Sequence, residues 1–362
     1  MDSMRHDEGM NGRAIRFTGN WREYLPIAAT NVLLVIVTLG VYRFWASARE
    51  RRYLWSRTHV IDDTLEWTGT GREMFFGFLM VMAVLLPFFL FIQVVFPALV
   101  ARGKEGAAAG LFTLFYLAVF VLIGFARFRA LRYRLSRTFW HGIRGGSDDS
   151  GWTYAAEYLG RSLAAFATMF IMFPWAQTSL WNLRWNKMSL GPLPFRADLT
   201  TDGLKRRWAL LYIAPLAIVV GGGVLAAIVG FSLRSSADAN GVTLTVIFLG
   251  LFSLVYLAIP LATLHWYAKY YRQAAAATHL GELDFGFDAT TGDWLKLFLG
   301  NIALAVVTLG FGISFWGYRN WSFIVRHAHL YGHIDLAGLT QSTTRAPRES
   351  EGFADAFDLG AI

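Results

Sequence analysis

"TGTGREMFFGFLMVMAVLLPFFLFIQVVFPALVA" (residues 68–101) decides the fold class of this chain. Between Met74 and Ala101 the only polar side chain is Gln93. A helix needs about 20 consecutive apolar residues to cross the hydrocarbon core of a bilayer. We therefore expect this stretch to form a transmembrane helix that begins shortly after the Thr-Gly pair.

Three further stretches of the chain are similarly apolar. Residues 108–126, 208–233 and 241–264 are almost free of charge, and each is about long enough to span a bilayer. Of all 362 residues, 55% are apolar and only 16% are charged, whereas about a quarter of a soluble domain is charged. The sequence therefore predicts an all-α polytopic membrane protein with four transmembrane helices and short cytoplasmic β-strands.

Three shorter apolar stretches, 25–42, 163–176 and 297–317, are harder to place. Each could span the membrane, enter and leave it on one side, or lie among the headgroups. All three share a pattern in which a polar residue precedes a threonine by seven positions. The pairs are Asn31 with Thr38, Arg161 with Thr168, and Asn301 with Thr308.

Other phrases return as well. "TGNWREYL" (18–25) has the Thr-Gly and Arg-Glu pairs of "TGTGREMF" (68–75), and "RERRYLWSRT" (49–58) resembles "RALRYRLSRT" (129–138). Thr and Gly suit the start of a helix, and Glu in the first turn suits its positive end. We interpret the Thr-Gly phrase as the end of a strand and the capped start of a helix. Phrases that return in this way predict internal repeats.

Strand-like alternation follows these phrases at 64–67, 283–287 and 334–336. With these strands included, the chain divides into two full repeats and a truncated one. The predicted boundaries are an N-terminal tail at 1–16, membrane repeat 1 at 17–150, membrane repeat 2 at 151–292, truncated repeat 3 at 293–340 and a disordered C-terminal tail at 341–362.

The basic residues predict the orientation, because Lys and Arg in short loops stay in the cytoplasm. If all seven apolar stretches crossed the membrane, the basic residues would divide almost evenly between the two sides. If the three short stretches enter and leave on the cytoplasmic side, only Arg102, Lys104 and Arg234 of the 33 lysines and arginines lie outside. We therefore expect the short stretches to be re-entrant or interfacial, with the N-terminus and basic loops cytoplasmic.

Two of these phrases also carry a resemblance to a known family. "NVLLVIVTLGVYRFWASARERRYLWSRT" (31–58), followed by "LEWTGTGREMFFGF" (65–78), resembles the signature of the YjgN family of bacterial inner-membrane proteins. The later copy "TLGFGISFWGYRNW" (308–321) departs from it by one inserted residue. The resemblance covers most of the chain and implies a multi-pass protein of the bacterial inner membrane. It implies no activity, substrate or catalytic residue.

No catalytic or metal-binding constellation stands out. The chain has no cysteine, which excludes disulfides, thiolate ligands and a cysteine nucleophile. His327, His329 and His333 are close in sequence, but His329 stands where His59 and His279 stand in the other copies. A zinc site needs three or four converging ligands. We therefore expect no metal and no other cofactor, and we assign no catalytic residue.

The polar residues of the short stretches provide one binding hypothesis. Polar groups at membrane depth are costly and face the bundle interior or a cavity. Such a site would suit a permease or channel for a small solute or lipid. Its residues would be Asn31, Thr38, Arg161, Thr168, Asn301 and Thr308. The alternative is that these residues bond to exposed backbone and hold the repeats together.

Arginines interleaved with aromatic residues provide the other hypothesis. They follow the positive-inside rule, or they bind anionic lipid headgroups. The residues considered for headgroup binding are Arg49, Arg52, Arg129, Arg132 and Arg137. On this view the protein is a non-transporting scaffold for anionic lipid or a cytoplasmic partner. Nucleic-acid binding is not indicated, because the topology accounts for the net charge of +8.

Overall fold

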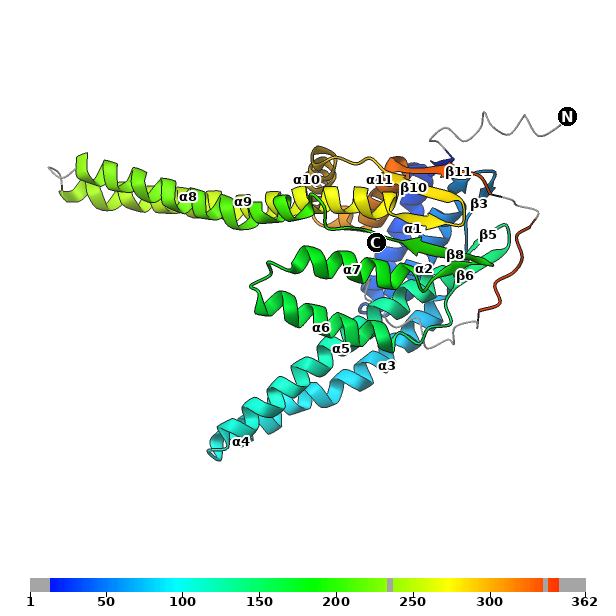
Figure 1. Cartoon of the computed structure of the whole chain (residues 1–362), viewed down its shortest axis with the longest axis horizontal. Helices are drawn as coiled ribbons and strands as arrows, with labels where there is room; N and C mark the ends of the chain where they lie inside the picture. The colour runs from blue at the N-terminus through cyan, green and yellow to red at the C-terminus, as the bar shows by residue number, and fades with distance from the viewer. Residues whose placement is uncertain (1–13, 233–236, 335–337, 345–362) are drawn as a thin grey trace.

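Helical hairpins that project from a group of β-strands make up the molecule (Figure 1). The computed structural model describes residues 14–232, 237–334 and 338–344. Within these ranges the order strand, helix, helix, strand occurs five times. The strands gather at one end of the molecule, and the helices point away from them (Figure 1).

Two of the helical hairpins are long and three are short. The long ones pair α3 (Gly71–Leu90), η1 (Phe91–Val95) and α4 (Phe96–Ala101) with α5 (Glu105–Arg137), and α8 (Leu204–Ser232) with α9 (Ala237–Ala276). The short ones pair α1 (Trp21–Val37) with α2 (Arg43–Ser56), α6 (Trp152–Ala167) with α7 (Phe173–Trp185), and α10 (Thr291–Val307) with η2 (Phe311–Phe315) and α11 (Trp316–His327).

Helix length separates the two kinds of hairpin. At 1.5 Å per residue α8 extends about 43 Å and α1 about 25 Å, whereas the hydrocarbon core is about 30 Å thick. Among the described residues, the helices long and apolar enough to cross a membrane are Gly71–Ala101, Glu105–Arg137, Leu204–Val229 and Thr245–Ala276. These are the four transmembrane helices that the sequence predicts.

The strands are short and antiparallel. A three-stranded sheet contains β1 (Ile15–Phe17), β2 (Thr58–Val60) and β3 (Asp63–Thr64). An eight-stranded sheet runs in chain order through β4 (Glu66–Trp67), β5 (Thr138–Trp140), β6 (Ile143–Gly146), β7 (Ser189–Leu190), β8 (Leu193–Ala197), β9 (Thr278–Leu280), β10 (Leu283–Phe287) and β11 (Ala328–Gly332). Only Leu65 separates β3 from β4, and β1 contacts β11, so the sheets adjoin at both ends.

This large sheet corrects the prediction of an all-α protein with short β-strands. Strands of two to five residues carry almost no periodicity of their own, so the sequence suggested only a few of them. Their pairing comes from the hairpins, which return the chain to the strand it left. A strand was also expected at 334–336. Ile334 lies after the end of β11 and is not part of the sheet, and residues 335–337 lie outside the described residues.

The strand register places both ends of every hairpin at the sheet. Phe17 pairs with Thr58 across the α1/α2 hairpin, and Trp67 pairs with Thr138 across the α3/α5 hairpin. The same pairing closes the α8/α9 and α10/α11 hairpins. The short stretches 25–42, 163–176 and 297–317 are therefore not single helices. Each contains a helix end and a tight turn, and the helix that returns starts inside the second and third stretches and directly after the first.

One threonine organises the tip of each short hairpin. Its hydroxyl donates to the carbonyl oxygen four residues earlier and accepts from the amide four residues later. The sets are Leu34–Thr38–Tyr42, Ala164–Thr168–Met172 and Leu304–Thr308–Gly312. The two residues after each threonine have positive φ, and Phe170 holds the place that Gly40 and Gly310 hold in the other tips. Pro174, near the end of the stretch 163–176, lies in the first turn of α7.

The helix caps lie two residues after the threonines of the Thr-Gly pairs, at Asn20 and Thr70. Thr18 and Thr68 continue the strands, because their amides donate to the carbonyls of Arg57 and Arg137. The residue that caps α3 is Thr70, in a capping box with Glu73. The threonine of each Thr-Gly pair thus makes the last hydrogen bond of the strand, and the helix cap comes after the glycine.

The buried core lies at the sheet end of the helices, and the apolar hairpins project beyond it. In the most apolar 18-residue segment of Gly71–Ala101 only 11% of the residues are buried, and in the corresponding segment of α8 none are. These surfaces need lipid around them. At the sheet, three tryptophans join neighbouring hairpins through Nε1–H bonds to threonine hydroxyls. The bonds run from Trp55 to Thr138, from Trp181 to Thr278 and from Trp321 to Thr58.

Residues 341–344 belong to the segment that was predicted to be a disordered tail. Gln341 donates to the Gly142 carbonyl at 2.8 Å, and Ser342 is buried. This part of the tail therefore lies against the β5–β6 turn. Residues 345–362 lie outside the described residues.

Candidate functional site

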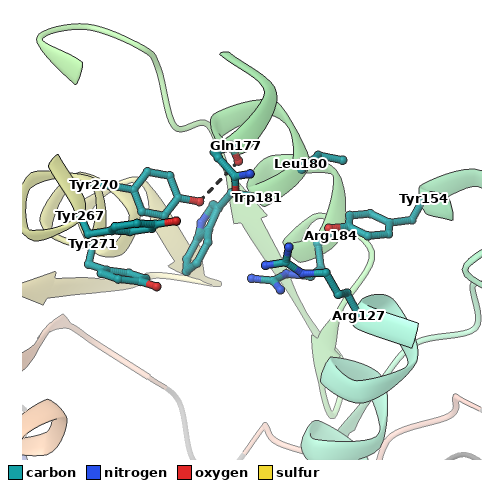
Figure 2. A pocket seen from close by; sticks show the side chains of 9 residues that line it. All are labelled: Arg127, Tyr154, Gln177, Leu180, Trp181, Arg184, Tyr267, Tyr270 and Tyr271. Atoms are coloured by element: carbon teal, nitrogen blue, oxygen red, sulfur yellow. Dashed lines mark hydrogen bonds between the residues drawn. The ribbon is translucent and has the colours of Figure 1, made fainter. Parts of the chain in front are cut away.

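A small cavity at the base of the helices is lined by two arginines. Its volume is about 70 Å³, more than the roughly 10–15 Å³ that one water requires. It is lined by Arg127 of α5, Tyr154 of α6, Gln177, Leu180, Trp181 and Arg184 of α7, and Tyr267, Tyr270 and Tyr271 of α9 (Figure 2). We refer to it as the arginine–tyrosine cavity. It has room for a small polyatomic ligand.

Helical spacing brings these side chains together. Gln177, Trp181 and Arg184 recur at intervals of four and three residues, so they share one face of α7. Tyr267 and Tyr271 share one face of α9 in the same way. The α9 face is fixed against α7 by the hydroxyl of Tyr270, which donates to the Gln177 carbonyl at 3.4 Å (Figure 2).

The cavity carries positive charge without a compensating acid. Both guanidinium groups point into it (Figure 2). No carboxylate lines it, and no ion pair of Arg127 or Arg184 is present in the described part of the chain. Arg184 is only 5% exposed, and the Nε atoms of both arginines are buried without a hydrogen-bond partner.

The electrostatics of Arg184 reflect this environment. Burial lowers the pKa of Arg184, and the positive charge of the neighbouring Arg127 acts in the same direction. The guanidinium also lies over the Trp181 ring, 5.4 Å from its centroid. A buried charge is costly unless it is paired. A bound anion would provide that pairing, and guanidinium groups match phosphate and carboxylate oxygens in bidentate geometry.

Sequence reasoning missed this cavity. Neither Arg127 nor Arg184 is among the site residues predicted from the sequence. The available signal was the pairing of "QTSLWNLR" (177–184) with "YAKYY" (267–271), each of which places polar and aromatic groups on one helical face. Nothing local shows that these two faces meet.

The polar residues predicted in the short stretches each bond within their own hairpin. In all three hairpins the partner is 18 residues away. Asn31 Oδ1 accepts from Arg49 Nη1 at 3.2 Å, Asn301 Oδ1 accepts from Arg319 Nε at 2.7 Å, and Arg161 Nε donates to Ser179 Oγ at 2.6 Å. In the α6/α7 hairpin the arginine thus lies on the first helix, whereas in the other two it lies on the second.

These bonds bring the predicted residues Asn31 and Arg49 together. No interaction among the described residues joins Asn31, Arg161 and Asn301 to one another. The three predicted threonines lie at the hairpin tips. A permease site built from these residues stays a prediction.

The other predicted arginines lie along the base of the helices. Arg129 Nε donates to the Ser150 carbonyl at 3.1 Å, and Arg132 Nη1 donates to the Asp149 carbonyl at 2.7 Å. Arg137 forms an ion pair with Glu73 at 2.6 Å. Arg52 is exposed. Headgroup binding by these residues stays a prediction.

Apolar hairpins on a platform of antiparallel strands define a polytopic membrane protein. The chain belongs to the family described as "Bacterial protein of unknown function (DUF898)", whose model matches residues 13–356. This confirms the resemblance to YjgN-type proteins, because the similar curated proteins carry that name.

Two such relatives are each called "Inner membrane protein YjgN". The protein of Salmonella typhimurium (strain LT2) is 29% identical over 146 residues, which is 40% of this chain and 34% of the relative. The protein of Escherichia coli O157:H7 is 30% identical over 128 residues, which is 35% of this chain and 29% of the relative. The chain thus spans about a third of the length of these relatives. No solved structure matches it.

Proposed function

We propose that the protein binds an anionic, phosphate-type group in the arginine–tyrosine cavity, as part of a membrane scaffold that recognises anionic lipid. The observation that carries this proposal is the presence of two guanidinium groups, one of them the buried group of Arg184, in one cavity without a carboxylate. Four tyrosines line the same space, and a tyrosine hydroxyl can donate to an anion's oxygen.

The position of the cavity supports a lipid headgroup as the source of the anion. Arg184 lies one residue before the end of α7, and Tyr154 lies two residues after the start of α6. The cavity is therefore beside the sheet. We propose that this end of the molecule faces the cytoplasm, because basic residues concentrate there and the positive-inside rule then holds. Anionic headgroups lie at that depth.

We also propose that the chain is built from copies of one strand–helix–helix–strand unit. The shared order of elements, the three bonds across 18 residues and the three threonine tips support this proposal. Five copies would replace the two and a half repeats expected from the sequence. In such an array the arginine–tyrosine cavity lies where the second, third and fourth copies meet.

The test compares lipid binding by the purified parent protein with lipid binding by its Arg184→Gln variant. Native mass spectrometry would compare retention of phosphatidylglycerol and phosphatidylcholine. A hydrogen bond to a charged group contributes about 1.5–3 kcal/mol, so we expect Arg184→Gln to bind phosphatidylglycerol roughly 10- to 100-fold more weakly. Arg52→Gln removes the same charge from an exposed position and serves as the matched control.

Inorganic phosphate distinguishes the source of the anion. If phosphate displaces phosphatidylglycerol from the parent protein and has no effect on Arg184→Gln, the cavity recognises the phosphate group itself. If phosphate binds while neither lipid does, the ligand is a soluble anion. Equal losses in Arg184→Gln and Arg52→Gln would contradict the assignment of this cavity.

A further inference from the structure

A second and larger cavity, of about 650 Å³, lies between the first and fifth hairpins. Its walls come from α2, α10 and α11, and α5 and α9 contribute one residue each. None of the residues that line the arginine–tyrosine cavity lines this one. The two spaces are therefore separate sites.

The lining changes along the helix axis. Arg134 lies three residues before the end of α5, and Arg51 lies five residues before the end of α2, so both are near the sheet. Ile302 lies eleven residues from the start of α10, and Leu264 lies twelve residues before the end of α9. At 1.5 Å per residue the arginine end and the apolar end are about 10 Å apart.

The apolar end is open to the surroundings of the protein. Phe298 is 57% exposed and Ile302 is 40% exposed, and both line the cavity. They lie on a short hairpin whose tip residue Leu309 is 97% exposed. A surface of this kind is stable only in contact with hydrocarbon. The cavity therefore opens toward lipid chains, and its arginines lie at headgroup depth.

The polar lining favours an anion. Two arginines, Arg51 and Arg134, and one acidic residue, Glu50, line the cavity. The Arg51 guanidinium lies 5.1 Å from the centroid of the Trp67 ring, so it is held in place at the base. Asn301 and Asn320 also line the cavity, and the rest of its wall beyond the arginines is mostly apolar. A cationic excess at the sheet end and mostly apolar walls beyond it match a phospholipid in both charge and polarity.

We propose that this cavity binds one anionic phospholipid of the cytoplasmic leaflet, with its headgroup toward Arg51 and Arg134 and an acyl chain along Phe298 and Ile302. The lipid enters sideways past α10. The α10/α11 hairpin ends within the bilayer, so the acyl chain of the bound lipid stays in contact with the leaflet. This site does not depend on the arginine–tyrosine cavity.

The test uses a single cysteine, because the chain has none of its own. Ile302→Cys is labelled with bimane and placed in vesicles that contain brominated phosphatidylglycerol or brominated phosphatidylcholine, whose bromine atoms quench bimane on contact. We expect phosphatidylglycerol to occupy the position about fivefold in excess, which is the effect of one net positive charge near a headgroup. Leu309→Cys, at the exposed tip, should be quenched equally by both lipids.

Variants of the two arginines at the sheet end of the cavity test whether they cause the lipid preference. Because Glu50 also lines the cavity, Arg51→Gln or Arg134→Gln alone should bring the preference at Ile302→Cys to about one. The double variant should bring it below one, and none of the three should change quenching at Leu309→Cys. Arg184→Gln should leave the preference at Ile302→Cys intact even if it abolishes anion binding in the small cavity. Equal quenching by both lipids in the parent, or stronger quenching by aqueous iodide than by either lipid, would overturn the inference.

Discussion

The bond between Asn31 and Arg49 yields a quantitative prediction about the short hairpins. Asn31 lies on α1 and Arg49 on α2, and their 3.2 Å contact is one of three equivalent contacts across 18 residues. If these polar pairs hold the hairpins together, Asn31→Leu should destabilise the fold. The alternative is a transport site, in which the same change would abolish activity and leave the fold intact.

The size of the effect follows from the geometry. A net contribution of about 1.5 kcal/mol is the lower end for a bond to a charged group, and 3.2 Å is at the long end of the N–H···O range. Double-mutant cycles on bonds between membrane helices average about 0.6 kcal/mol and reach about 1.7. We therefore expect a coupling energy of about 1 kcal/mol between Asn31→Leu and Arg49→Met. That corresponds to roughly a fivefold change in the unfolding equilibrium constant.

The assay is unfolding in mixed micelles of dodecyl maltoside and sodium dodecyl sulfate, followed by tryptophan fluorescence. Asn301 and Arg319 provide the internal comparison, because their bond is shorter at 2.7 Å. We expect the larger coupling in the Asn301→Leu and Arg319→Met cycle. Coupling near zero in both cycles, or a larger value for Asn31 and Arg49, would refute the structural role of these pairs.

Three further predictions concern the caps, the tips and the topology. Thr70→Val removes the hydroxyl that accepts from Glu73 and should lower the unfolding free energy by about 1 kcal/mol in the same micelle titration. Phe170 has a φ of 66°, and a left-handed conformation costs roughly 1–2 kcal/mol, so Phe170→Gly should raise the thermal midpoint and Gly310→Ala should lower it; shifts of the same sign would contradict this account. An impermeant maleimide should label Gly103→Cys only from outside the cell and Leu309→Cys from neither side. Outside labelling of Leu309→Cys would show that the short hairpin crosses the membrane.

The four transmembrane helices and the contrast between long and short apolar stretches could be read from the sequence. Apolar length is a local property, and burial in lipid needs no particular neighbour. The capping phrase was predicted with an error of two residues. Thr68 suits a cap by residue type, but its amide completes the strand pair with Arg137, so the helix starts only after Thr70.

The sheet could not be predicted in this way. Glu66 pairs with Phe139, and the α3–α5 hairpin separates them. A strand of two residues has no measurable alternation, so its partner is decided by where the hairpin returns the chain. The phrases that repeat in the sequence mark these returns, but they do not say which strand lies next to which.

The sequence by itself determined that this is a membrane protein, where its spanning segments lie and which end carries positive charge, because each of these is a sum over neighbouring residues. Only the tertiary structure decided which polar groups share a space. Asn31 and Asn301, which looked like site residues, are bonded within their own hairpins. Arg127 and Arg184, which lie 57 positions apart in the numbering, line one cavity. The free energy of placing two like charges in one cavity depends on what else lines that cavity, and that is a property of packing.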